Sequence, residues 1–321
     1  MTAPLLRLPG TGLDVSRICL GGNRFGAQLD RDASFEVLDI FHEAGGNFID
    51  TAHVYADWIP EIERSASEKT IGRWLAARGL QDGVVVATKG GHPDLASPAQ
   101  GRLDPRSLRE DAEGSRENLG IGRLPLFYLH RDDPARPVED ILGALEGLRD
   151  RGVVRHYAAS NWTPARLAEA TRTARQNGWQ GFVANQPEWS LAQRNPGSAA
   201  ADLVAMDAGM LAWHRQTGTA AIPYSAQARG YFDKLAAGRV DPATAEAYDG
   251  PRNRALSERL GGIAARLGAT PTQVMLAILL RAPFPVVPVV GARTRAQILS
   301  CFESLTLDLG EQDWSGLGAP A

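Results

Sequence analysis

The sequence predicts an α/β fold in which eight strands and their covering helices form one (β/α)8 TIM barrel over residues 1–321. Short apolar runs alternate with amphipathic stretches along the chain, an order typical of parallel strands covered by helices. The composition does not break at any point, and this length is ordinary for a single barrel domain. Eight such units favour a closed barrel over an open sheet.

The elements follow one another regularly. The expected strands are Ile18–Leu20, Asn47–Asp50, Val84–Thr88, Leu126–Leu129, Val154–Ala158, Val183–Asn185, Ala220–Pro223 and Val286–Val289. The amphipathic stretches between them include Ala33–Ala44, Ser67–Arg78, Ser107–Leu119, Val138–Arg151 and Thr163–Asn177. In Val138–Arg151 the apolar residues recur at three- and four-residue spacing, which indicates one buried helix face. Thr163-Pro164 and Thr270-Pro271 each place a capping residue before a proline suited to the first helical position.

Two segments depart from a bare barrel. Leu5–Val15 has the pattern of a β-hairpin with a glycine-containing turn, and we expect it to plug the amino-terminal end of the barrel. The connection Ser225–Gly268 follows the seventh strand and is too long for an ordinary loop. It contains a further helical pattern from about Arg254 to Leu267. A connection of this length is often functional.

Composition and charge exclude several classes of protein. A net charge of −3 gives no basic face for nucleic acid and no polybasic segment for a membrane surface. Residues 1–10 lack the pattern of a signal peptide, and no apolar run approaches the length of a membrane span. Only Cys19 and Cys301 are present, which fits a reducing compartment. We therefore expect a cytoplasmic protein that binds neither nucleic acid nor membrane.

Polar and ionisable residues occur where successive expected strands end, which is where barrel enzymes carry their active sites. In chain order they are Asp50, Lys89, His130, Ser160-Asn161, Gln186 and Tyr224. Each residue alone has an ordinary structural explanation, such as a cap, a solvated lysine or a core aromatic. Their convergence on one rim is the stronger signal, and it predicts an active site at that rim.

These residues belong to motifs through which the chain resembles the aldo-keto reductase superfamily over nearly its full length. The motifs are Asp50-Thr51-Ala52-His53-Val54-Tyr55, Ser67-Glu68-Lys69-Thr70-Ile71-Gly72, Ala87-Thr88-Lys89-Gly90, Tyr128-Leu129-His130-Arg131-Asp132-Asp133, Gly152-Val153-Val154-Arg155-His156-Tyr157, Ala159-Ser160-Asn161, Asn185-Gln186-Pro187-Glu188-Trp189-Ser190 and Val289-Val290-Gly291-Ala292-Arg293. Each motif alone is weak. Their order at successive strand ends makes the resemblance specific.

The resemblance implies a catalytic tetrad of Asp50, Tyr55, Lys89 and His130. Carbonyl reduction needs a hydride for carbon and a proton for oxygen, and Tyr55 would supply the proton. A free phenol has a pKa near ~10, so we expect a Lys89 ammonium to lower the pKa of Tyr55 and to stabilise the developing alkoxide. Asp50 would keep the buried lysine charged. His130 would orient the carbonyl oxygen by a hydrogen bond.

The resemblance also implies an NADPH site. Its expected contacts are Gly22, Ser160, Asn161, Gln186, Tyr224, Ser225, Gln227, Gly230, Gly291, Arg293 and Gln297. Those from Ser160 to Gln186 would bind the nicotinamide carboxamide, and Tyr224 would stack on the ring. The long connection after the seventh strand would cover the cofactor.

At the adenosine end, the resemblance assigns the 2′-phosphate to a guanidinium. Arg293 is the first candidate and Arg295 the second, because the planar fork of arginine matches phosphate oxygens. Ser300-Cys301 stands where the family usually has Glu-Asn. We therefore expect the adenine end to be held less tightly than in typical relatives, or differently.

The expected substrate is a small carbonyl compound. Its candidate contacts are Asn23, Arg24, Phe25, Trp58, Arg131 and Trp162. Aromatic side chains there can pack against sugar or aliphatic carbon, while the polar ones can bind hydroxyls or an anion. This polar, aromatic-edged mouth favours a sugar-like or hydroxylated carbonyl over a steroid.

Three alternatives remain open. The family includes potassium-channel β subunits, which retain the cofactor site and bind a membrane partner. A second alternative uses the same cofactor for an internal redox step such as sugar epimerisation, with the same tetrad. A third is a metal-dependent barrel hydrolase using His53, His92, His130 and Asp50. The last is disfavoured because the sequence has no His-x-His after the first strand and no His-Glu-x-x-His, so we expect no metal.

Overall fold

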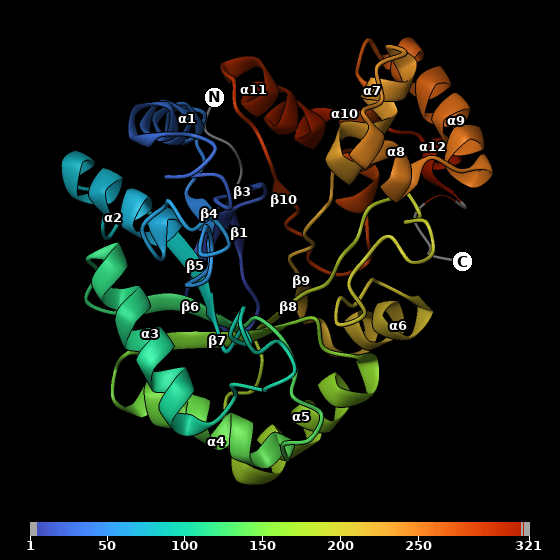
Figure 1. Ribbon diagram of the computed structural model, residues 1–321. Helices are drawn as coiled ribbons and strands as arrows, with labels where there is room; N and C mark the ends of the chain where they lie inside the picture. Colours follow the sequence, from blue (N-terminus) through green and yellow to red (C-terminus); the bar gives the residue numbers. More distant parts are fainter. Residues whose placement is uncertain (1–4, 316, 318–321) are drawn as a thin grey trace.

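The computed structural model describes residues 5–315 and residue 317. Within this range a two-stranded antiparallel hairpin precedes an eight-stranded parallel sheet (Figure 1). The hairpin strands are β1 (Leu5–Arg7) and β2 (Asp14–Ser16). The parallel strands are β3 (Cys19–Gly21), β4 (Phe48–Asp50), β5 (Val85–Gly90), β6 (Leu124–Leu129), β7 (Val154–Ser160), β8 (Ala184–Gln186), β9 (Ala220–Ala221) and β10 (Val289–Val290).

The eight parallel strands close into a barrel. Their order is β10-β3-β4-β5-β6-β7-β8-β9, so successive strands along the chain are neighbours. The two ends are joined by hydrogen bonds of 2.9 Å from Ala221 N to Pro285 O and from Val287 N to Ala221 O. β10 is shorter than expected because Pro288 has no N–H to donate to a neighbouring strand. The expected barrel with an N-terminal hairpin is confirmed.

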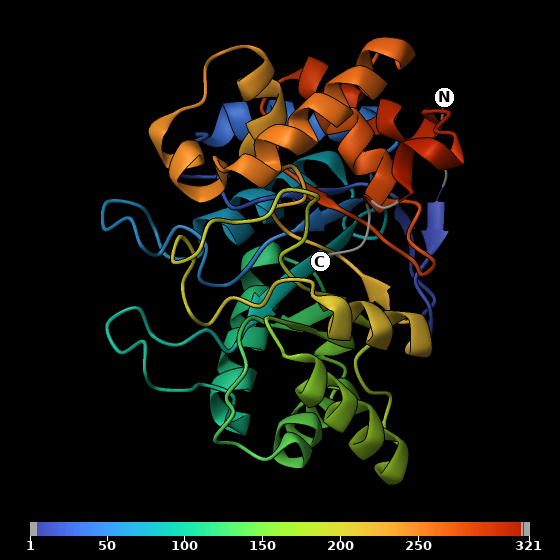
Figure 2. The same ribbon diagram turned by 90° about the vertical axis from the view of Figure 1, so that its right-hand side faces the viewer.

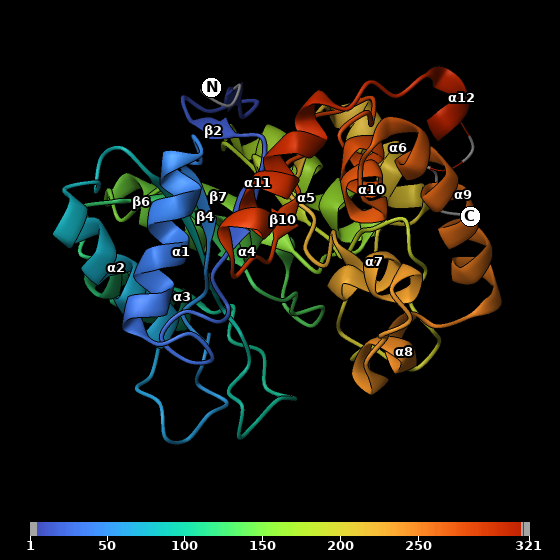
Figure 3. The same cartoon turned by 90° about the horizontal axis from the view of Figure 1, so that it is seen from above.

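The barrel strands are surrounded by helices (Figures 1 and 3). These are α1 (Arg31–Glu43), α2 (Ala66–Arg78), α3 (Pro105–Leu119), α4 (Val138–Asp150), α5 (Pro164–Asn177), α6 (Ala208–Thr217), α10 (Pro271–Leu279) and α11 (Arg295–Glu303). Both helix starts expected from Thr-Pro pairs are present. The Thr163 side chain accepts a hydrogen bond from Arg166 N, and Thr270 forms a reciprocal capping box with Gln273.

The hairpin covers the amino-terminal end of the barrel. Leu8, Leu13 and Val15 are buried in one cluster with side chains of the barrel strands. Phe48 of β4 and Leu126 of β6 belong to this cluster. The hairpin thereby removes the apolar interior of the barrel from water. The carboxyl ends of the strands remain as the open face.

The connection between β9 and β10 contains more helix than the sequence pattern indicated. It holds η1 (Ala228–Gly230), α7 (Tyr231–Ala236), α8 (Pro242–Tyr248) and α9 (Pro251–Leu267), all before α10. Figure 1 shows α7, α8 and α9 grouped beside α10, and Figure 2 shows this orange segment across the top of the molecule. The chain ends with η2 (Ser304–Thr306) and α12 (Glu311–Trp314). α7 and α8 are too short to show helical periodicity in the sequence.

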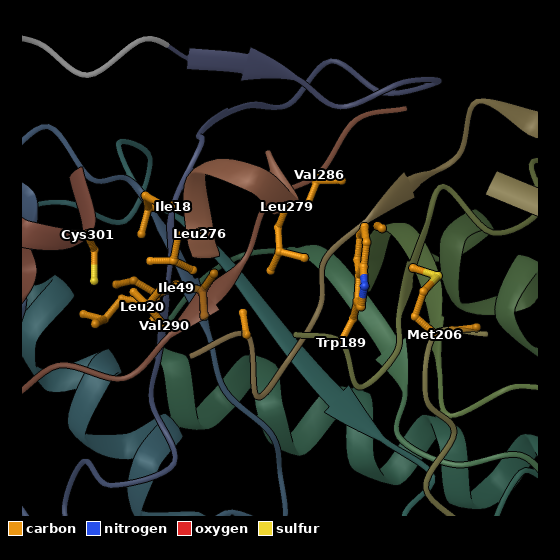
Figure 4. Packing of buried hydrophobic residues seen from close by; sticks show 14 of the residues in the cluster. Ile18, Leu20, Ile49, Trp189, Met206, Leu276, Leu279, Val286, Val290 and Cys301 are labelled. Carbon is orange, nitrogen blue, oxygen red and sulfur yellow. The ribbon is translucent and has the colours of Figure 1, made fainter. Parts of the chain in front are cut away.

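The main hydrophobic core lies between the strands and the helices. Figure 4 shows Ile18, which precedes β3, together with Leu20 of β3 and Ile49 of β4 beside Leu276 of α10. Cys301 of α11 belongs to the same buried cluster. This packing fixes α10 and α11 against the first strands. The end of β3 and the start of α11 are thereby held at one rim of the barrel.

In the described part of the chain, no single helix combines the length and apolar composition of a membrane span. The pair α9 and α10 meets that test of length and composition only together, across a bend of 98°.

Candidate active site

Lys89 lies at the centre of a buried polar cluster at the carboxyl end of the barrel. Its Nζ is 2.6 Å from Asp50 Oδ2, 2.8 Å from Thr51 O and 3.0 Å from the Tyr55 hydroxyl. Asp50 ends β4, and Lys89 is on the adjacent β5. Their side chains are 4% and 1% exposed, respectively. The structure therefore brings together three of the four residues expected to form the tetrad in direct contact.

The fourth expected residue, His130, follows β6 and faces the same cluster. Its ring centroid is 5.8 Å from that of Tyr55, in an edge-on arrangement. Burial, assisted by the positive charges of Lys89 and Arg131, holds the pKa of His130 well below its ordinary value. His130 is therefore a neutral imidazole at physiological pH, able to donate one hydrogen bond.

Electrostatics keep Lys89 charged and Tyr55 protonated. Burial opposes the charged form of Lys89, but Asp50 and Tyr55 outweigh it, so the pKa of Lys89 is raised. For Tyr55, burial raises the pKa, and the Lys89 ammonium offsets only part of that rise. Lys89 thus acts in the expected direction by lowering the pKa of Tyr55, but burial outweighs it and the net shift is upward. Tyr55 keeps its proton at neutral pH.

The expected carboxamide contacts form a second cluster next to the first. Ser160 Oγ donates to Gln186 O at 2.8 Å, and Asn161 Nδ2 donates to Ser160 Oγ at 3.2 Å and to His130 O at 3.1 Å. Asn161 Oδ1 accepts from the Tyr224 hydroxyl at 2.9 Å. The Asn161 amide is thus already committed to protein partners. A ligand amide that bound Asn161 would have to replace one of them.

A third network, which the sequence motifs contained but did not explain, supports the cluster from α2. The fully buried Glu68 carboxylate accepts hydrogen bonds from the hydroxyl of Thr88 and from Asn118 Nδ2. Ser67 Oγ donates to Gly22 O at 2.8 Å and lies 2.7 Å from Thr51 Oγ1. The start of α2 therefore ties together the ends of β3, β4 and β5, which carry the site.

A cavity of about 1190 Å³ extends from the tetrad toward α11 and the connection that holds α7 and α8. Its lining includes Asp50, Tyr55 and His130, while Lys89 lies buried behind them. All of the expected cofactor contacts line it: Gly22, Ser160, Asn161, Gln186, Tyr224, Ser225, Gln227, Gly230, Gly291, Arg293 and Gln297. The structure thus brings residues from nearly the whole chain to one continuous cavity.

The far end of the cavity is closed by contacts across the two sides. Gln227 Oε1 accepts from Gly291 N at 2.8 Å, and Gln227 Nε2 donates to the buried Cys301 Sγ at 3.4 Å. Arg293 is exposed and makes no ion pair with any described residue. Arg295 instead pairs with Glu43 Oε2 of α1 at 2.7 Å. Of the two arginines, Arg293 is therefore the one whose guanidinium has no ion-pair partner among the described residues.

Cationic residues of the long connection also line the cavity, and sequence inspection missed them. They are Arg229, Lys234 and Arg239. Lys234 Nζ is 2.6 Å from Asp241 Oδ2 and 3.1 Å from Thr244 Oγ1, at the start of α8. The presence of basic residues in a connection of this length was the feature of the sequence that could have identified them.

Backbone strain gathers in the same region. Ser225, Ala228 and Arg229 have positive φ angles of 54°, 46° and 58°, and Asn161 has 59°. Left-handed backbone is costly for residues other than glycine, and it clusters at binding sites. Asn161, Ser225 and Arg229 line the cavity, and Ala228 lies between Gln227 and Arg229, which both line it.

The expected substrate contacts divide into three groups. Asn23, Arg24 and Arg131 line the cavity, whereas Trp58 lies beside it with its ring edge-on to Tyr55 at 6.1 Å. The expectation is wrong for Phe25 and Trp162, because both are buried in the hydrophobic core and do not line the cavity.

Two of these side chains are already engaged with protein groups. Trp162 packs edge-on against Phe182 at 5.0 Å. Arg131 is paired with Asp202 Oδ2 at 2.6 Å, which partly neutralises its charge toward an anion.

The histidines considered for a metal site have other partners. His53 Nδ1 is 3.3 Å from Glu68 Oε2, and His92 lies against His130. Across residues 5–315 and 317, no group of three or more His, Cys, Asp or Glu is placed to hold a metal ion.

A closed (β/α)8 barrel with an Asp–Lys–Tyr cluster and a long cavity at its carboxyl end defines an oxidoreductase of the aldo-keto reductase class. The chain belongs to the aldo/keto reductase family, whose sequence model matches residues 17–319.

Named relatives agree with this membership. A norsolorinic acid reductase of Emericella nidulans is 29% identical over 95% of this chain and 78% of its own length. An aryl-alcohol dehydrogenase [NADP(+)] of Phanerodontia chrysosporium is 29% identical over 95% of this chain and 82% of its own. The crystal structure of a thermostable aldo-keto reductase with the inhibitor epalrestat matches with a TM-score of 0.73, at 21% identity, over 98% of both chains. That structural match supports the fold alone.

Proposed function

We propose that this protein reduces the carbonyl group of an aldehyde or ketone to an alcohol, using NADPH as the hydride donor and Tyr55 as the proton donor. The observation that carries the proposal is the position of Lys89, between Asp50 at 2.6 Å and the Tyr55 hydroxyl at 3.0 Å. This charged contact lies at one end of the long cavity. A buried ammonium in that position stabilises negative charge on the tyrosine oxygen as it releases its proton.

The residues of the cavity fit a dinucleotide phosphate. Gly22 lines it where a Cβ would come within 2.9 Å of Asp50 O, so glycine lets this backbone lie directly against the end of β4. At the opposite end, Arg293 offers a guanidinium that has no ion-pair partner among the described residues, near the start of α11. Arg229 and Arg239 add positive charge to the lining, whereas the charge of Lys234 is balanced by Asp241 at 2.6 Å. When bound, NADPH would supply the hydride.

The chain's own residues account for the proton transfer. Tyr55 is protonated at neutral pH because burial raises its pKa. Lys89 stays positive beside it, since its own pKa is raised by Asp50 and Tyr55 against the effect of burial. The neutral His130 donates a hydrogen bond to the carbonyl oxygen. The proton of Tyr55 then moves to that oxygen, and Lys89 stabilises the phenolate that remains.

We infer an aromatic carbonyl compound as the substrate class, in preference to the sugar-like compound that polar residues at the mouth suggested. Trp58 is 48% exposed on the β4–α2 loop and Leu95 is 45% exposed on the β5–α3 loop. Figure 3 shows both loops projecting from the same end of the barrel. Arg131 is held by Asp202. Relatives named for aryl alcohols and for norsolorinic acid support the same class.

The decisive experiment compares wild type with Tyr55→Phe on a panel of aromatic aldehydes, aryl ketones and aldoses, followed by NADPH absorbance. We expect Tyr55→Phe to lose about a hundredfold or more of kcat while its NADPH affinity stays unchanged, because only the acid is removed. Tyr157→Phe is the matched control, since its hydroxyl contacts Glu146 rather than the cavity. Near-wild-type kcat in Tyr55→Phe would overturn the assignment. Product analysis separates net reduction from epimerisation.

A further inference from the structure

The backbone of His130 is firmly held, but its ring is not. His130 N donates to Gly90 O at 2.8 Å, and its carbonyl oxygen accepts from Arg131 Nη1 at 2.9 Å and Asn161 Nδ2 at 3.1 Å. The side chain is only 7% exposed, and its buried Nδ1 makes no hydrogen bond with any described residue. A neighbour that bonds one ring nitrogen usually fixes the orientation of a histidine. Here that anchor is absent from the described part of the chain.

Two aromatic rings flank the His130 ring instead. Tyr55 lies edge-on at a centroid distance of 5.8 Å and an interplanar angle of 73°. His92 lies closer, at 4.9 Å and 68°. Edge-on aromatic pairs at these separations are attractive as well as space-filling. Ring packing therefore replaces the missing hydrogen bond in setting the direction of His130.

His92 is itself rigidly placed, which suits it to this task. Its Nδ1 lies 2.7 Å from Pro93 O, so this nitrogen carries a proton, because a carbonyl oxygen can only accept. Its backbone carbonyl accepts from Arg102 Nη1 at 3.3 Å, and Arg102 Nη2 also binds Asp111 at 2.7 Å. Asp111 in turn accepts from Gly91 N at 2.8 Å. Hydrogen bonds to Gly91 N and to the His92 carbonyl thus fix the backbone on both sides of the His92 side chain.

We propose that His92 is a positioning residue for carbonyl reduction, holding the His130 imidazole against Tyr55. This inference rests on the proposed function. His92 does not line the cavity, so it acts through His130 and not on the substrate. Because the buried Nδ1 has no acceptor among the described residues, we infer that the single proton of the neutral ring is on Nε2, from which it is donated.

The charged and titratable groups that face His130 are Lys89, Arg131, His92 and Tyr55. The first three oppose a positive charge on His130, as does burial, which is the largest contribution to its low pKa. His92 is half-buried, so its removal would admit water to the His130 ring. The pKa of His130 would then rise toward its ordinary value, and the neutral donor would be lost at mildly acidic pH.

The test compares wild type, His92→Ala and His92→Phe on one aromatic aldehyde, with kcat, KM and NADPH affinity measured from about pH 5.5 to about pH 8. We expect His92→Ala to lower kcat about tenfold, with NADPH affinity within about twofold of wild type. An inflection near pH 6.5, absent in wild type, should appear in its kcat profile. His92→Phe keeps the aromatic edge and should restore kcat to within about threefold of wild type, without the inflection.

His42→Ala is the matched control. His42 lies edge-on to Trp74 at 6.2 Å and has Nδ1 3.3 Å from Gly46 O, so it makes the same kinds of contact away from the cavity. Its removal should leave kcat and the pH profile unchanged. Wild-type kcat and pH profile in His92→Ala, with Tyr55→Phe inactive, would overturn this inference alone. So would a loss in His92→Phe equal to that in His92→Ala. Equal turnover by wild type and Tyr55→Phe would instead overturn the proposed function and this inference with it.

Discussion

Gln186 and Asp50 are 136 positions apart in the chain, yet Gln186 Nε2 donates to Asp50 Oδ1 at 2.8 Å. The other carboxylate oxygen of Asp50 accepts from Lys89 at 2.6 Å. Asp50 therefore connects the expected catalytic cluster to the expected carboxamide-binding cluster. A change at Gln186 should reach both, because a buried carboxylate needs partners on both oxygens.

Replacing Gln186 by Leu should destabilise the fold and weaken NADPH binding together. The substitution leaves Asp50 Oδ1 buried without its donor, which costs roughly 1–3 kcal/mol. Gln186→Glu should be worse at neutral pH, because it places a second carboxylate against the first, and it should recover partly when the solution is acidified. Urea unfolding at neutral and acidic pH measures the loss of stability in Gln186→Leu and the pH-dependent loss in Gln186→Glu. Wild-type stability in Gln186→Leu would show that the contact contributes nothing.

Tyr224 offers a separate test of the cofactor site. If its ring stacks on the nicotinamide, Tyr224→Ala should weaken NADPH and NADH by the same factor, roughly twofold to tenfold for one aromatic pair. Tyr224→Phe loses only the hydrogen bond to Asn161 Oδ1 and should stay close to wild type. Fluorescence titration with each cofactor gives the dissociation constants. A loss confined to NADPH would contradict stacking, because the ring does not sense the 2′-phosphate.

The buried His214 should make stability depend on pH. Burial lowers its pKa from 6.5 to about 4, although the hydrogen bond to Thr219 O offsets part of that effect. Because the folded pKa is below the unfolded one, the stabilisation is complete above pH 6.5 and is lost as the pH falls toward about 4.

Between about pH 7.5 and about pH 5.5, His214 alone should remove about 1 kcal/mol from the free energy of unfolding. His214→Gln cannot titrate and should show a correspondingly smaller loss over the same interval. Chemical denaturation at the two pH values makes the comparison. Identical pH dependence in the two proteins would mean that His214 does not titrate with a low pKa.

The expected tetrad could be placed from sequence because strand ends in a barrel converge on one rim. Asp50, Lys89 and His130 each follow or end a strand whose apolar run is visible in the chain. The balance of forces on Tyr55 was not visible. Whether Lys89 or burial dominates its pKa depends on depth and distance, which no spacing in the sequence encodes.

Side-chain direction explains the other differences. Phe25 and Trp162 both follow strand ends, as true cavity residues do, but their rings turn into the core. Glu68 stood within a recognised motif, yet its contact with Thr88 exists only once α2 packs beside β5. Lys234 lies in a helix too short to leave a periodic pattern. In each case the missing information is tertiary.

The remaining prediction concerns cofactor preference and depends on the adenosine end of the site. Arg293 is exposed, lines the cavity and has no ion pair with any described residue, whereas Arg295 is held by Glu43 at 2.7 Å. If Arg293 binds the 2′-phosphate, wild type should prefer NADPH over NADH by about tenfold to a hundredfold, the range of one charge-assisted hydrogen bond. Arg293→Ala should erase most of this preference by weakening NADPH alone.

Arg295→Ala is the matched control for cofactor preference, because it removes the same guanidinium two residues away while releasing only the contact with Glu43. It should leave the preference largely intact. Added salt should shrink the wild-type preference, since an exposed ion pair is screened, and should have little effect on Arg293→Ala. Dissociation constants for both cofactors at two salt concentrations test these expectations together. Equal affinity of wild type for NADPH and NADH would contradict the assignment of the 2′-phosphate to Arg293. The contact between Gln227 and Cys301 would then be the part of the adenosine end to alter next.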